Sequence, residues 1–137
     1  MRLMAVLTGL ILTLTGCGTP AYESFAPPEA FPTLQEFEAL AGCLRPDLKI
    51  EHRSGEFDLL GLTAVEKGTI WLWPERIEIG WYRTVLMHEL IHAHGHSWHS
   101  DDPDSLMFDR REQSGTPPEP AESELKHVWR YCATEVQ

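Results

Sequence analysis

Basic side chains are scarce in this sequence. Its 137 residues include 11 lysines and arginines against 21 aspartates and glutamates, which gives a formal net charge of -10 at pH 7. A domain with this charge repels phosphate backbones and anionic lipid surfaces. The composition therefore argues against nucleic acid as a partner and against a basic patch as the means of membrane attachment.

Long apolar runs and repeats are missing as well. No internal repeat is visible, and the largely apolar stretch at residues 3–14 is too short to cross a bilayer as a helix. This stretch follows Arg2 and leads to Cys17, which is the layout of an export signal. The residues that end it, Leu14-Thr15-Gly16-Cys17, resemble the lipobox of bacterial lipoproteins.

The resemblance implies a signal peptide over residues 1–16 and a lipid on Cys17. The lipid would anchor the protein in the bacterial cell envelope, at the outer membrane or the cell surface. An ordinary cleaved signal, or an uncleaved anchor, is the alternative. Residues 17–32 contain four prolines and few apolar residues in register, which predicts a flexible tether. Residues 33–137 are then expected to form one folded domain.

Cysteines number only three, and a lipidated Cys17 leaves two. An even pair in a small exported domain predicts one disulfide, between Cys43 and Cys132. The bond would close a loop of about ninety residues, which the chain-entropy model values at roughly 4 kcal/mol or more. Two buried thiols are the alternative.

Helix and strand patterns both occur along the expected domain. Thr33 opens a capping-box pattern for a helix that ends near Gly42. Residues 48–52 and 69–73 have strand character, whereas residues 57–62 fit either state. Helical spacing returns at residues 80–95 and after Pro120, with an irregular segment between them. The pattern predicts an α+β fold.

The strongest chemical signal is the pentapeptide His88-Glu89-Leu90-Ile91-His92. Residues four apart lie on one face of a helix, so both imidazoles can reach one zinc ion. Glu89, beside the first ligand, is expected to act as general base toward a metal-activated water. A chance pair of core or solvated histidines is the alternative.

The residues after this motif resemble the metzincin clan of zinc peptidases, in particular its matrixin-like members. Gly95 is in the position that ends the active-site helix, a histidine follows, and Ser105-Leu106-Met107 matches the Met-turn. The family has two residues between the glycine and its third histidine, whereas His99 comes one residue late. His99 is nevertheless the expected third ligand because its spacing to Met107 is matrixin-like.

His96 is the alternative third ligand, and Asp101 or Asp102 could substitute, as an aspartate does in some small secreted metzincins. His94 is expected to be solvated or to lie behind the ligands. The resemblance implies a zincin-like domain with a twisted, mostly parallel sheet, an active-site helix and a C-terminal helix.

The same resemblance suggests where substrate lies and what the protein does. The strand residues Ile70, Trp71 and Leu72 would form the sheet edge that binds an extended peptide, although two indoles on one face could equally be core. The expected function is a zinc endopeptidase that acts on proteins or peptides with one Zn2+.

Two other functions stay open. In one, the third ligand is a glutamate on the last helix, Glu122 or Glu124, as in the other main class of zincins. In the other, the protein is a lipoprotein that binds zinc without catalysis, since five of its seven histidines fall within residues 88–99.

Overall fold

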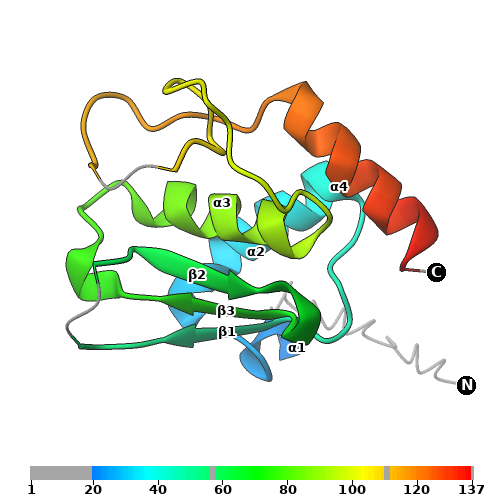
Figure 1. The fold of residues 1–137 in the computed structure, drawn as a ribbon. Helices are drawn as coiled ribbons and strands as arrows, with labels where there is room; N and C mark the ends of the chain where they lie inside the picture. Colours follow the sequence, from blue (N-terminus) through cyan, green and yellow to red (C-terminus); the bar gives the residue numbers. More distant parts are fainter. Residues whose placement is uncertain (1–19, 56–57, 110–111, 137) are drawn as a thin grey trace, which may run out of the picture.

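The computed structural model describes residues 20–55, 58–109 and 112–136, and within these ranges it describes the side chains from residue 22 onward. The longer elements are α1 (Pro20–Glu23), α2 (Phe31–Ala41), β1 (Lys49–His52), β2 (Gly61–Ala64), β3 (Thr69–Leu72), α3 (Tyr82–Ala93) and α4 (Glu122–Thr134). The helices α1 and α2 precede the strands, and the helices α3 and α4 follow them, so the predicted α+β class is confirmed (Figure 1). None of the described helices is long and apolar enough to cross a membrane.

The sheet in the described part of the chain has three strands in the order β1-β3-β2. β3 pairs with β1 in parallel and with β2 in antiparallel orientation, so the sheet is mixed rather than mostly parallel. The reason is the connection between β2 and β3. Only a single 3-10 turn (Val65–Lys67) joins them, and so short a link permits antiparallel pairing alone.

β3 is therefore the central strand, and the expectation that Ile70, Trp71 and Leu72 form a substrate-binding edge is wrong. Their backbone groups pair with neighbours on both sides. Ile70 and Leu72 are fully buried in the core, whereas Trp71 lies on the other face, where it donates a hydrogen bond to Glu51 and packs under Arg53. The edge strand beside α3 is β2.

One face of the sheet packs against the helices. α3 contacts β2 and β3, while α2 packs against both α3 and α4 (Figure 1). The core between these layers is made of fully buried apolar side chains, which include Leu34, Phe37, Leu86, Leu90 and Ile91. α3 is buried around most of its circumference, so its polar side chains Thr84, Glu89 and His92 lie in the interior of the protein.

The segment expected as a tether belongs to the folded domain from residue 22 onward. Tyr22 and Ala30 are buried, and the backbone N–H of Ile50 in β1 donates to the Phe25 carbonyl at 2.7 Å. The first full helix begins at Phe31, two residues before the predicted capping box, and it tolerates Pro32 because the first helical turn needs no N–H donor there. The expected signal peptide and Cys17 lie outside the described residues.

A disulfide joins the ends of two helices. Cys43 follows Gly42, which ends α2 with a φ of 89°, and its sulfur is bonded to that of Cys132 on α4. The predicted pairing is therefore confirmed. Because 89 residues separate the two cysteines, the bond holds the C-terminal helix against the N-terminal half of the domain.

Candidate metal centre and its cleft

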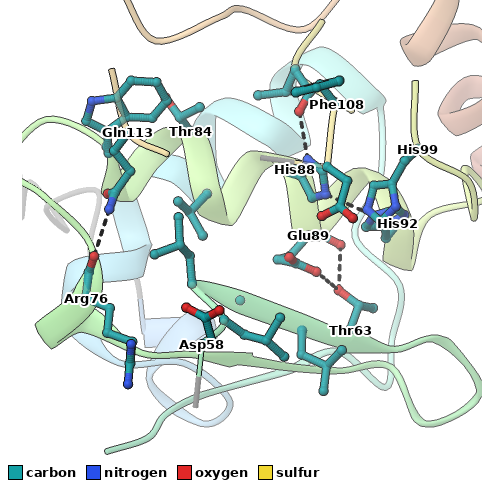
Figure 2. A pocket seen from close by; sticks show the side chains of 18 of the residues that line it. Asp58, Thr63, Arg76, Thr84, His88, Glu89, His92, His99, Phe108 and Gln113 are labelled. Atoms are coloured by element: carbon teal, nitrogen blue, oxygen red, sulfur yellow. Dashed lines mark hydrogen bonds between the residues drawn. The ribbon is translucent and has the colours of Figure 1, made fainter. Parts of the chain in front are cut away.

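Three imidazoles converge beside α3. His88 and His92 lie four residues apart on this helix, and their Nε2 atoms are 3.0 Å apart. His99 arrives from the loop that follows the helix, with its Nε2 atom 3.1 Å from that of His92 (Figure 2). All three rings offer nitrogens within 4.8 Å of one another, so together they could hold a metal ion. His99, rather than His96, is therefore the third member of the group.

The other ring nitrogens of the two helical histidines are fixed by backbone carbonyls. Nδ1 of His88 donates to the Leu106 carbonyl at 2.7 Å, and Nδ1 of His92 donates to the His96 carbonyl at 2.7 Å. A carbonyl can only accept, so each Nδ1 carries a proton and each neutral ring presents its Nε2 lone pair to the other. Two facing lone pairs repel unless a cation lies between them.

A proton shared between the two rings could be that cation, but burial of the rings disfavours their protonation. Burial lowers the pKa of His88 to about 4, against the weaker opposite effect of the Leu106 carbonyl, and it also lowers the pKa of His92. Both rings are therefore neutral at pH 7. Imidazoles held in one tautomer by a backbone partner are the usual arrangement of histidine metal ligands.

His96 and His94 have other surroundings. The ring of His96 stacks on Trp98 with centroids 4.3 Å apart and meets the edge of His127 at 4.9 Å. His94 was expected to be solvated or to lie behind the ligands, and the first of these expectations is wrong because His94 is fully buried. It accepts a hydrogen bond from the Arg45 N–H at 2.9 Å and donates to the Leu90 carbonyl, and burial lowers its pKa to about 4.

The carboxylate of Glu89 is buried at the side of the same cleft. Only 6% of the residue is exposed, and its Oε2 atom accepts a hydrogen bond from the Thr63 hydroxyl on β2 at 2.6 Å (Figure 2). Burial raises the pKa of Glu89 to about 7, the charge of Asp109 adds to this rise, and the Thr63 hydrogen bond opposes it. A carboxyl group in this range can take up and release a proton near neutral pH.

The histidines and Glu89 line one cavity of about 470 Å³. Its walls come from β2, from α3 and from the loops on either side, with Trp81, Val85 and Leu106 among the apolar members. At the end far from the histidines, the amide of Gln113 accepts from the Glu78 N–H at 2.6 Å and donates to a backbone carbonyl at residue 76 (Figure 2). This side chain holds the late loop against the segment before α3.

The expected Met-turn is a compact turn that contacts the ligand group. The hydroxyl of Ser105 accepts from the Met107 N–H at 3.0 Å, and the intervening Leu106 supplies the carbonyl for His88. Met107 is fully buried in the core, and its carbonyl accepts from the Ser100 N–H at 2.8 Å. Its position beneath a metal stays a prediction.

Neither glutamate of the last helix takes the role of third ligand. Glu124 is buried, but its carboxylate accepts from the Ser105 hydroxyl at 2.5 Å and from the Ala121 N–H at 2.9 Å. Glu122 is exposed and lies 3.7 Å from Lys126. Neither glutamate belongs to the group that could hold a metal ion. Through its hydrogen bond with Ser105, Glu124 instead supports the turn whose Leu106 carbonyl orients His88.

Several residues of the cleft escaped the sequence analysis. Gly61 belongs to the segment 57–62, whose state was ambiguous, and Thr63 directly follows it. Asp109, which also lines the cavity, lies two residues beyond Met107. A strand over residues 61–64 would have placed Gly61 and Thr63 on one face, and this alternation could have indicated both. Asp109 could have been noted as the acidic side chain nearest to the Met-turn.

Comparisons with models of protein families, with curated proteins and with solved structures found no match to this chain. The functional argument therefore depends on the site itself.

Proposed function

We propose that this protein is a zinc-dependent endopeptidase of the metzincin-like kind. The observation that carries the proposal is the convergence of three imidazole Nε2 atoms in a cavity that also contains the buried carboxylate of Glu89. A carboxylate beside a closed storage site would have no task, whereas a hydrolytic site needs a base at this position.

The donor set suits zinc. Three histidines with one open position are typical of catalytic zinc, and tetrahedral ligands at 2.0–2.1 Å place their nitrogens about 3.3 Å from one another. The two shortest Nε2 separations, 3.0 and 3.1 Å, are close to this value. His88, His92 and His99 would hold the ion, while the carbonyls of Leu106 and His96 keep the first two rings oriented.

The chain's own residues divide the remaining work. Zinc, when bound, supplies a Lewis acid that polarises a carbonyl group and lowers the pKa of water. Glu89 takes the proton from the water that attacks the scissile carbonyl carbon, and then gives this proton to the nitrogen of the leaving amine. The apolar side chains of the cavity wall would displace water from the reacting groups when a peptide fills the cleft.

An extended peptide is the substrate that fits the cleft best. β2 is an edge strand, and its residues Gly61, Leu62 and Thr63 line the cavity. A peptide backbone laid along this edge would add a strand to the sheet and bring its scissile bond to the histidines. If the lipobox is used, the substrates are proteins or peptides of the cell envelope.

The test joins metal content with cleavage. The purified protein is analysed for zinc by mass spectrometry and incubated with unfolded casein, with and without a chelator. The expected result is about one zinc per chain and cleavage that the chelator abolishes. The matched control is Glu89→Gln, which should keep its zinc and lose cleavage.

Two results would contradict the proposal. Cleavage that survives in Glu89→Gln would remove the proposed base, and a protein without zinc would remove the metal. Stoichiometric zinc without cleavage of casein or of peptide libraries would instead favour a zinc-binding lipoprotein.

A further inference from the structure

The side chain of Glu89 is held in one position by β2. The Thr63 hydroxyl lies 2.6 Å from Oε2 of Glu89 and 3.1 Å from the backbone carbonyl of the same residue. One hydroxyl therefore contacts both the carboxylate and the helix that carries it (Figure 2). A hydrogen bond to a buried charged group is among the stronger ones in proteins.

The register of the sheet explains why Thr63 points at the helix. Thr63 pairs with Ile70, a fully buried residue of the face that packs against α3. Gly61 is two residues earlier and shares this face. A Cβ atom added to Gly61 would lie 2.9 Å from Cγ of Glu89, 3.0 Å from its Oε1 and 3.1 Å from Leu72. The glutamate side chain thus rests directly on the strand backbone, in a space that only glycine leaves open.

We propose that Thr63 is a positioning residue for Glu89, with Gly61 providing the space in which the carboxylate lies. The inference rests on the proposed function. The Thr63 hydroxyl donates its hydrogen bond to Oε2 of Glu89. The other carboxylate oxygen, Oε1, is then the one that accepts the proton from the attacking water. Because the same strand would bind the peptide backbone, β2 fixes the base and the scissile bond relative to each other.

The first experiment compares three threonine variants of the full protein by steady-state cleavage of a quenched peptide. Thr63→Val removes the hydroxyl at nearly constant volume and should lower kcat about tenfold to a hundredfold, with KM and zinc content unchanged. Thr63→Ser keeps the hydroxyl and should recover most of kcat. Thr69→Val, the same change on β3 outside the cavity lining, is the matched control and should behave as wild type.

A second measurement needs no catalysis. Thermal unfolding of Thr63→Val, Glu89→Ala and the double variant should show that the double variant loses less in Tm than the sum of the two single changes, since each alone removes one partner of the same hydrogen bond. Gly61→Ala serves if Thr63→Val does not fold. Its added methyl group should displace the carboxylate and lower kcat while zinc stays bound.

The outcomes separate the two proposals. A wild-type protein that cleaves, together with a Thr63→Val variant that keeps the wild-type kcat and additive Tm changes, would overturn the positioning role alone. A Thr63→Ser variant as impaired as Thr63→Val would do the same. A wild-type protein that holds zinc and cleaves nothing would overturn the proposed function, and the positioning role with it.

Discussion

Replacing His99 by alanine should weaken zinc binding far more than replacing His96. Zinc sites with four protein ligands bind with about 10 to 16 kcal/mol, so one ligand accounts for roughly 3 kcal/mol and its loss for at least a hundredfold in Kd. The Nε2 atom of His99 lies 3.1 Å from that of His92, within the group that could hold the metal. His99→Ala should therefore raise the Kd for zinc by about a hundredfold or more.

His96 contributes to the site in a different way. Its backbone carbonyl accepts the hydrogen bond from His92, and an alanine at this position retains that carbonyl. His96→Ala loses only the ring contacts with Trp98 and His127, so the Kd should rise by less than about tenfold. Competition with a chromogenic chelator at neutral pH measures both values. His127→Ala is the matched control, since it loosens the same aromatic cluster without touching the ligand group.

The order of the two Kd values for zinc, with His99→Ala weaker than His96→Ala, is what the experiment can refute. A hundredfold loss in His96→Ala, with His99→Ala close to wild type, would mean that the loop rearranges when metal binds and that the third ligand is His96. Equal small losses in both variants would mean that metal is held elsewhere.

Three further changes test the supports of the site. Glu124→Ala should lower the Tm and weaken zinc binding up to about tenfold, because the Glu124 carboxylate holds the turn that orients His88. Glu122→Ala, an exposed change on the same helix, is the control and should alter neither the Tm nor zinc binding. Reduction of the Cys43–Cys132 bond should lower the Tm, since closing an 89-residue loop contributes up to about 4 to 5 kcal/mol, and an unchanged transition would refute the bond. His94→Ala should cost about 2 to 4 kcal/mol in denaturant unfolding, because it leaves a cavity in the interior and removes the imidazole partner of the buried Leu90 carbonyl and of the partly buried Arg45 N–H. A loss below 1 kcal/mol would contradict this reasoning.

The convergence of the three histidines was predictable because its sequence signal is local. The spacing of His88 and His92 requires only one helical turn, and apolar residues around them indicated that helix. His99 followed from its distance to Met107 in the family pattern. The disulfide was predictable for another reason, since the expectation of a lipid on Cys17 left only one possible pairing of the cysteines.

The order of the strands could not be read from the sequence. The segment 69–73 has the strongest strand character, and such a segment fits a central position as well as an edge. β2 contains Gly61 and Ala64, whose low strand propensity hid it, although Gly61 is what lets the Glu89 side chain of α3 lie against the strand. The prediction of a flexible tether over residues 17–32 failed because prolines occur both in flexible segments and in first helical turns. Only the burial of Tyr22 and Ala30 in the structure distinguishes the two cases.

The contacts that orient the ligands were invisible for a more general reason. His88 and His92 are held by carbonyls of Leu106 and His96, and every residue type supplies a carbonyl. What matters is where the backbone passes, and the hydrogen bond between Ser105 and Glu124 fixes that path on one side. The side chains determine which chemistry the site can perform. The orientation of His88, however, depends on the turn at Ser105–Met107, which Glu124 of the last helix supports. Substitutions in that helix should change metal affinity without changing any ligand.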